Sequence, residues 1–165
     1  MTIFLKMTKY MWRYKKMKIA LGSDHAGLSL KREIIKHLEE KSLEIKDFGT
    51  YTEESCDYPD YAYAVAKEVA DKNYDLGILV CGTGIGISMA ANKVKGIRAA
   101  ACSDTFSAHA SREHNNANII AVGERVVGVG LAIDIVDTFL NASFEGGRHQ
   151  RRIDKITEIE NGRDK

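Results

Sequence analysis

Short apolar runs alternate with longer amphipathic stretches along most of this chain, and this alternation restricts its fold more than any other feature. The apolar runs span residues 18–22, 43–48, 76–81, 97–102 and 118–122. Several are almost continuously apolar, which is typical of strands covered on both faces of a parallel sheet. The stretches with helical spacing span residues 28–41, 59–73, 85–94, 105–115, 128–140 and 151–160. This pattern predicts an α/β fold, a doubly wound (Rossmann-like) three-layer sandwich with a five-stranded parallel sheet.

The segment before the first apolar run differs in charge from the rest of the chain. Residues 1–16 hold five Lys or Arg and no acidic residue, whereas the 165-residue chain holds 24 basic and 23 acidic side chains. Residues 17–165 therefore keep 19 basic against 23 acidic side chains, a net charge of −4. We expect a basic extension over 1–16, one domain over 17–160 and a tail over 161–165. A short arm that binds RNA or an acidic surface is the alternative for the extension.

Composition argues against several classes of protein. No stretch of about 18 consecutive apolar residues occurs, so we expect no membrane partner. The negative charge of residues 17–165 disfavours nucleic acid as a partner. The extension has neither the apolar core nor the cleavage site of a secretory signal. The three cysteines show no CxxC spacing and suit a reducing compartment, so we expect a cytoplasmic protein.

The turn after the first apolar run places a carboxylate beside an imidazole. Ligands of doubly wound sheets bind beyond the carboxyl ends of the strands, so such turns are candidate sites. This one reads GSDHAG and contains Asp24 and His25. Asp24 could instead cap the following helix, whereas His25 has no evident structural role. In that helix, Leu30 and Ile34 belong to an apolar stripe, and we expect Lys31 to face water.

The turn after the third apolar run is rich in glycine and reads CGTGIGIS from Cys81 to Ser88. Its alternate glycines expose backbone N–H groups at the start of a helix, which favours an anion. We expect a thiol at Cys81, beside this positive end of the helix, to act as a base or nucleophile. The alternative is a small buried apolar side chain. Because the spacing matches neither GxGxxG nor a P-loop, a dinucleotide site with Asp47 as the ribose ligand is a weaker alternative.

Polar residues later in the chain form further candidate contacts for a ligand. His114 ends a helix, where the helix dipole favours a cation, and the amide of Asn115 could contact sugar hydroxyls. Arg125 follows the fifth apolar run. Arg148 and Arg152 are four residues apart, so on a helix they share a face and could hold one phosphate. The sequence shows no compact His/Cys/Asp cluster, so we expect no metal site.

These motifs occur together in one known family. GSDHAG, DYPDYA, CGTGIGISMAANK, SREHNNAN, VGERVVG and EGGRHQRR follow one another between residues 17 and 160. The sequence resembles the ribose-5-phosphate isomerase type B family, whose relatives include galactose-6-phosphate and allose-6-phosphate isomerases. The resemblance implies an aldose–ketose isomerase that interconverts D-ribose 5-phosphate and D-ribulose 5-phosphate through an enediolate, without cofactor or metal. Some members use a glutamate base from another loop position, but this chain has Ile87, Ser88 and Met89 there and keeps Cys81.

The resemblance also implies a role for each candidate residue. Cys81 matches the base that moves a proton from C2 to C1, and Thr83 matches the hydroxyl that moves one between O1 and O2. His114, with Asp24, matches the group that opens the furanose ring. The other residues match substrate ligands: the backbone amides of Gly82, Gly84, Gly86 and Ser88 for the enediolate, His25, Arg125, Arg148 and Arg152 for the phosphate, Asn115 for sugar hydroxyls and Tyr58 as an aromatic wall.

Members of the family are dimers whose sites take residues from both subunits. The resemblance therefore implies a homodimer with shared sites, with a tetramer as the alternative. Two other functions stay open on the sequence alone. One is a hexose-6-phosphate isomerase, and the other is a noncatalytic nucleotide or sugar-phosphate binding module in which Cys81 only packs.

Overall fold

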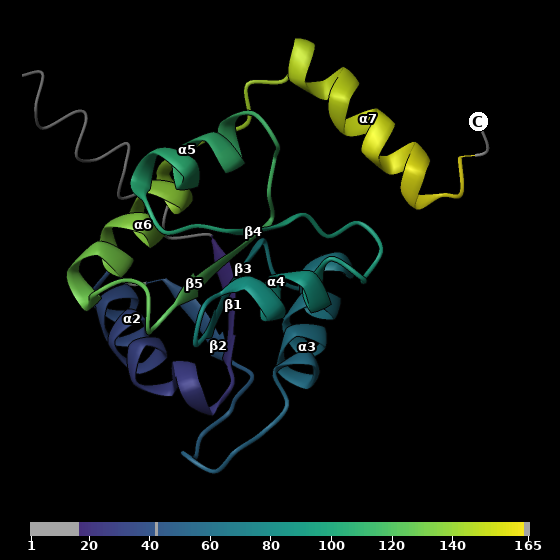
Figure 1. The fold of residues 1–165 in the computed structure, drawn as a ribbon. Helices are drawn as coiled ribbons and strands as arrows, with labels where there is room; N and C mark the ends of the chain where they lie inside the picture. The colour runs from purple at the N-terminus through teal and green to yellow at the C-terminus, as the bar shows by residue number, and fades with distance from the viewer. Residues whose placement is uncertain (1–16, 42, 164–165) are drawn as a thin grey trace, which may run out of the picture.

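A computed structural model describes residues 17–41 and 43–163, and these form one parallel sheet with helices on both faces (Figure 1). The strands are β1 (Lys18–Ser23), β2 (Glu44–Asp47), β3 (Leu76–Cys81), β4 (Ala99–Ala101) and β5 (Ile119–Gly123). The α-helices are α2 (Leu28–Glu40), α3 (Tyr58–Ala70), α4 (Ile85–Ala91), α5 (Thr105–Glu113), α6 (Val129–Asn141) and α7 (Arg148–Glu160). The predicted fold class is confirmed, while the expected extension over 1–16 lies outside the described residues.

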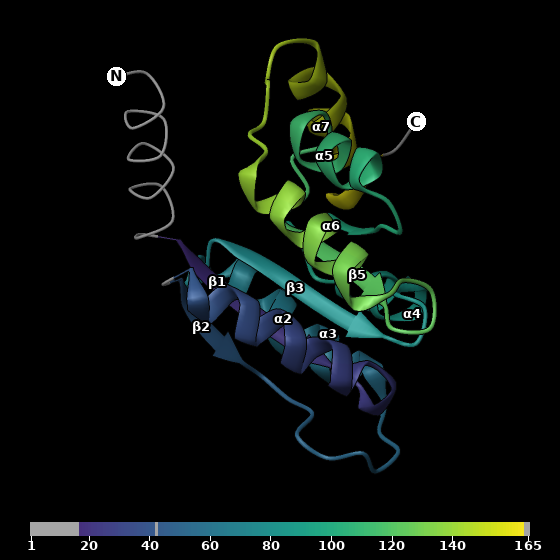
Figure 2. The ribbon, with the colours of Figure 1, turned by 90° about the vertical axis from the view of Figure 1, so that its left-hand side faces the viewer.

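Two apolar layers join the helices to the sheet. One lies between the sheet and α2, α5 and α6, and the other lies between the sheet and α3 and α4. Figure 2 shows α2 and α6 side by side across one face of the sheet. Among the described residues, no helix has the length and apolar character that crossing a bilayer requires.

The order of the strands fixes where a ligand can bind. All neighbours in the sheet are parallel, and the order is β2-β1-β3-β5-β4. The chain leaves β1 toward β2 on one side and later adds β3 on the other, so the direction of winding reverses between β1 and β3. Ligands of such sheets bind in the crevice outside the carboxyl ends of the strands at this point. Those two ends are Ser23 and Cys81.

Lys31 contradicts the expected helical pattern. Its side chain is fully buried, and Nζ donates to Asp47 Oδ1 at 2.7 Å and to the Thr50 carbonyl at 2.7 Å. Burial lowers the pKa of Lys31, while the Asp47 carboxylate acts in the opposite direction. The expectation that Lys31 faces water is wrong because the loop after β2 covers that side of α2. Asp47 is correspondingly engaged within the fold, which removes the argument for it as a ribose ligand.

The final helix begins earlier than the sequence pattern predicts. It starts at Arg148 instead of residue 151, directly after Gly146 and Gly147, whose φ angles are 69° and 55°. Glycine adopts such left-handed conformations at little cost, so the pair can turn the chain sharply into the helix. As a result, Arg148 and Arg152 both lie within α7. Asp57 precedes α3, but it makes no side-chain capping bond there.

Candidate active site

Backbone hydrogen bonds join the three turns that follow β1, β3 and β5. The amide of Asp24 donates to the Val80 carbonyl at 3.3 Å, that of Glu124 to the Cys81 carbonyl at 2.9 Å, and that of Arg125 to the Gly82 carbonyl at 3.0 Å. The Glu124 carboxylate also accepts the Leu30 N–H of α2 at 2.9 Å. These bonds bring the candidate residues of the turns after β1 and β3 to one edge of the sheet, beside Arg125 in the turn after β5.

The glycine-rich loop wraps around the Cys81 sulfur. Cys81 is 5% exposed, and the Gly84 N–H donates to its Sγ at 3.0 Å. Gly84 has φ of +79°, a left-handed conformation that turns its amide back toward the end of the strand. Thr83, two residues after Cys81, is exposed, and its Oγ1 accepts the Ile85 N–H at 3.3 Å. The loop thus presents a sulfur and a hydroxyl together.

Ser88 differs from the other residues of this loop. Its amide donates to the Gly84 carbonyl at 3.3 Å, and its hydroxyl donates to the Ile85 carbonyl at 2.8 Å. Both groups therefore serve the first turn of α4. The loop positions before α4 are better placed than Ser88 to donate to an anion.

Asp24 does not cap the helical turn that follows it. The turn at His25–Gly27 has no side-chain capping bond from Asp24. Asp24 is 6% exposed, and its Oδ1 is one of the buried atoms in the described residues that have no hydrogen-bond partner. A buried carboxylate oxygen without a partner is costly. Its position at the β1–β3 edge makes it available to a ligand hydroxyl.

His25 and Arg125 lie beside this loop. The Cys56 N–H donates to His25 Nδ1 at 3.2 Å, so the proton of the neutral ring lies on Nε2. The Arg125 side chain packs against Gly82, within 3.5 Å of where a β-carbon would lie. A pocket of about 380 Å³ adjoins them, lined in part by His25, Arg32 and Arg125. The two guanidinium groups and the His25 Nε2–H can donate to a phosphate, while the carboxylates of Glu53 and Glu124 also line this pocket. The pocket does not reach Cys81.

Tyr58 lies over the start of α4. A β-carbon on Gly86 would come within 2.8 Å of the Tyr58 ring, so the ring packs closely on the loop backbone. Tyr58 keeps 40% of its surface exposed at the first position of α3. Tyr58 therefore borders the glycine-rich loop, and its role as an aromatic wall stays a prediction from the resemblance.

A second group of candidate residues lies elsewhere in the chain. His114 and Asn115 follow α5, and Arg148 and Arg152 belong to α7. The His114 ring stacks on His149, with ring centroids 4.4 Å apart and planes 6° from parallel. The Glu145 N–H donates to the Glu113 carbonyl at 3.0 Å, which ties the segment before α7 to the end of α5.

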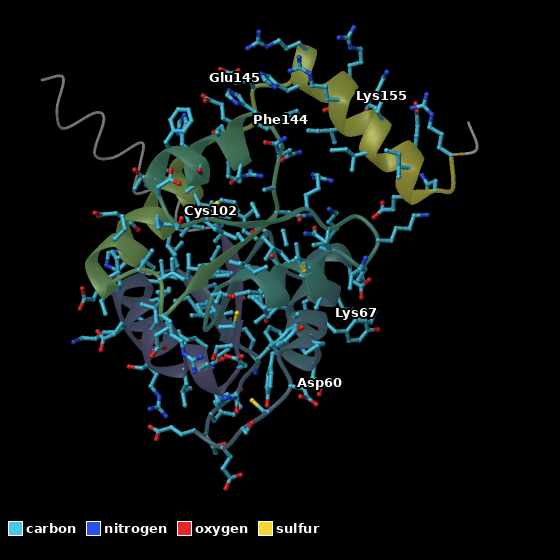
Figure 3. All side chains as sticks on the ribbon, viewed as in Figure 1. Asp60, Lys67, Cys102, Phe144, Glu145 and Lys155 are labelled. Atoms are coloured by element: carbon cyan, nitrogen blue, oxygen red, sulfur yellow. The ribbon has the colours of Figure 1, made fainter. Side chains whose placement is uncertain are left out.

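The two groups lie at opposite ends of the sheet within one chain. His114 precedes β5 and Arg125 follows it, and a five-residue strand spans about 16 Å. Figure 3 shows the same separation, with Asp60 near the start of α3 at one end of the molecule and Glu145 near the start of α7 at the other. A single chain therefore brings Cys81, Asp24 and Arg125 together, but it does not bring His114 or Arg148 to them.

His149 and the cluster around it were not predicted from the sequence. His114, Glu145 and His149 bring possible ligand atoms within 4.8 Å of one another, so the fold assembles a compact cluster that the sequence did not indicate. Arg148 Nε already donates to His149 Nε2 at 3.3 Å. This bond, with the positive charge of Arg152 nearby, disfavours a metal cation there. The only sequence signal for His149 is its place between two arginines of the GGRHQRR motif.

Comparisons with known proteins agree with this architecture. The family model described as Ribose/Galactose Isomerase matches residues 19–156. Ribose-5-phosphate isomerase B of Escherichia coli is 56% identical over 146 residues, covering 88% of this chain and 98% of that protein.

Solved structures of similar proteins also match. Clostridium thermocellum ribose-5-phosphate isomerase B has a TM-score of 0.87 at 59% identity, covering 88% of this chain and 98% of that one. Ribose-5-phosphate isomerase B of Mycoplasma genitalium, solved with bound ribulose-5-phosphate, has a TM-score of 0.85 at 48% identity, covering 90% and 99%. The resemblance seen in the motifs is confirmed, and the chain belongs to the ribose/galactose isomerase family.

Proposed function

We propose that this chain is an aldose–ketose isomerase that interconverts D-ribose 5-phosphate and D-ribulose 5-phosphate through an enediolate. The observation that carries the proposal is the Cys81 sulfur at the carboxyl end of β3, held by the Gly84 N–H at 3.0 Å beside an unpartnered Asp24 oxygen. Relatives at 46–56% identity bear the name ribose-5-phosphate isomerase B, and one is solved with ribulose-5-phosphate. We place the enzyme in the cytoplasm, where its three free cysteines stay reduced.

The proton transfer uses the glycine-rich loop. Cys81, as the thiolate, takes the proton from C2 of the open-chain aldose, and the electron pair of that bond moves to form the enediolate. Backbone amides of Gly82 and Gly86 stabilise the developing negative charge, as preorganised donors do, while the Gly84 N–H holds the sulfur. Thr83 moves a proton between O1 and O2, and the Cys81 thiol returns its proton at C1.

Ring opening and phosphate binding require the second group of residues. His114, with Asp24, moves the proton from O1 to the ring oxygen of the furanose. His25, Arg125, Arg148 and Arg152 bind the phosphate, and Asn115 contacts sugar hydroxyls. Because one chain keeps the two groups apart, we propose a homodimer in which each site takes the second group from the partner chain.

The final helix supports this assembly. Figure 1 shows α7 extending away from the layers that cover the sheet. Two of its apolar side chains, Ile156 and Ile159, are 48% and 68% exposed. Exposed apolar side chains along a protruding helix favour packing against another protein surface. A second copy of this chain would cover them and bring Arg148 and Arg152 to its own loop.

The test of the function is replacement of Cys81 by Ala. We expect turnover of D-ribose 5-phosphate to fall by at least about a thousandfold, because the base is gone, while the substrate dissociation constant changes by less than about threefold. Cys56→Ala, which also removes a thiol near the site, is the matched control and retains Cys81. Wild-type turnover in the Cys81→Ala variant would show that another group is the base.

A panel of aldose phosphates separates this function from its alternatives. We expect the five-carbon phosphate to be converted with the highest kcat/KM, measured without added metal or nicotinamide. A hexose-6-phosphate isomerase would instead prefer a six-carbon substrate. A noncatalytic binding module would bind sugar phosphates without converting any of them.

A further inference from the structure

The stacked imidazoles beside the start of α7 support one inference that rests on the proposed function and deepens it. We propose that His149 is a positioning residue, which holds the His114 ring by stacking and holds Arg148 by accepting its Nε–H. His149 thus acts through two residues of the proposed site. It would contact neither the reacting carbons nor the phosphate.

The stacking supports the first half of this role. His149 is buried, with a side chain 7% exposed, whereas the His114 side chain is 40% exposed. The nearly parallel planes and the 4.4 Å between centroids place one flat face of His114 on the buried ring. The buried His149 ring, stacked against His114, restricts the rotation of the His114 ring about χ2, which is otherwise broad for histidine. Orientation of this kind is what a proton transfer to a ring oxygen requires.

The hydrogen bond supports the second half. Arg148 Nε donates to His149 Nε2 at 3.3 Å, so Nε2 is unprotonated and the neutral ring carries its proton on Nδ1. Burial lowers the pKa of His149, and the positive charges of His114, Arg148 and Arg152 act in the same direction. Glu145 Oε2, 3.5 Å from Nε2, opposes them. A neutral His149 keeps its acceptor for Arg148, and His114 Nε2 lies 3.6 Å from Glu113 Oε2.

Histidine combines a flat ring with a hydrogen-bond acceptor, and two variants separate these properties. His149→Phe keeps the ring face and loses the acceptor. We expect KM to rise about tenfold because Arg148 is no longer oriented, with kcat for the aldose within about threefold of wild type. His149→Gln keeps an acceptor and loses the ring. We expect kcat for the aldose to fall about tenfold because His114 is no longer oriented, with KM nearly unchanged.

The aldose and the ketose differ in whether they form a ring, and this difference separates a defect in ring opening from a general loss of structure. The aldose phosphate is mostly a closed furanose, but the ketose phosphate is open because its O5 is esterified. Exchange of the C1 proton of the ketose in D₂O therefore measures enediolate formation without ring opening. For His149→Gln we expect this exchange to stay within about threefold of wild type while conversion of the aldose falls about tenfold.

The control variant is Arg151→Ala, which removes a charge from an exposed position of the same helix. Thermal melting and sedimentation confirm that each variant keeps its fold and assembly. The inference is overturned if His149→Gln converts the aldose like wild type, if it loses conversion and exchange equally, or if His149→Phe and His149→Gln have the same kinetic defect. Wild-type protein that converts no aldose phosphate would instead overturn the proposed function.

Discussion

At the residue scale, two buried thiols have different surroundings and different chemistry. Cys81 accepts the Gly84 N–H at the edge of the sheet, where a ligand would lie. Cys102 is 7% exposed within the apolar layer under α5 and α6. Burial raises the pKa of Cys102 to about 11, and the Asp104 carboxylate adds to this shift while Ser111 opposes it. Cys102 is therefore a neutral packing thiol at neutral pH, the role that the sequence left open for Cys81.

This shift predicts how Cys102 affects stability at alkaline pH. The unfolded thiol, with a pKa near 9.0, loses its proton before the folded thiol, whose pKa is about 11. The folded state then binds more protons, so stability falls as pH rises through this window. Between pH 7.5 and 10.5 we expect the unfolding free energy of wild type to drop by about 2 kcal/mol more than that of Cys102→Ala. Urea titrations at both pH values measure this, and equal drops would contradict the assignment.

Lys31 shows why some buried residues escape prediction from sequence. Helical spacing places it at the border of the stripe that contains Leu30 and Ile34, and a lysine at a border is ordinarily solvated. Its partners are Asp47, the last residue of β2, and the Thr50 carbonyl in the loop that follows β2. Periodicity within one helix carries no information about a loop that folds over it.

Replacement of Lys31 by Met should be strongly destabilising. Methionine keeps most of the volume but leaves the Thr50 carbonyl and the Asp47 carboxylate without their buried donor, which costs about 3 kcal/mol. The matched control is Arg32→Met on the exposed side of α2, for which we expect less than about 1 kcal/mol. Urea denaturation of both variants measures the difference. Equal losses would mean that burial of the ammonium contributes nothing beyond packing.

At the element scale, the glycine-rich loop depends on the strand next to it. Gly123 ends β5, and a β-carbon there would lie 2.6 Å from the carbonyl carbon of Thr83. Gly27, at the start of α2, would similarly meet the carbonyl carbon of Val80 at 2.5 Å. Backbone atoms cannot move aside as side chains do, so these two glycines let the neighbouring turns approach closely. The motif glycines 82, 84 and 86 are thus supported by glycines outside the motif.

Gly123→Ala should therefore displace the loop and reduce catalysis. The added methyl group forces Thr83 and Cys81 to shift, and a misplacement of about 1 Å can cost about a hundredfold in rate. We expect kcat to fall at least about tenfold together with a lower melting temperature. Gly130→Ala in α6, where nothing lies within 4 Å of the added methyl group, is the control and should keep wild-type kcat. Unchanged kcat in both variants would show that the loop tolerates the shift.

At the scale of the whole molecule, the sequence predicted the sheet and its carboxyl edge better than the complete site. The third strand was predicted with its observed ends, because a run buried on both faces has clear limits. Turns after strands point to Asp24, His25 and Cys81 without knowledge of the fold. His114 and Arg148 are different, since only the return of α5 and α6 to the amino end of the sheet makes them neighbours. In the proposed homodimer, the partner chain places them beside Cys81.

Mixing two inactive variants tests that dependence directly. Cys81→Ala lacks the base and Arg148→Ala lacks a phosphate ligand, so each alone should be nearly inactive when assayed at a substrate concentration well below the wild-type KM. If sites are shared across a dimer, every mixed dimer contains one site with both residues intact. Random exchange makes half of the dimers mixed, so activity should recover to about one quarter of wild type. Recovery should appear only after conditions that allow subunits to exchange, and mixtures that stay inactive after exchange would show that each chain completes its own site.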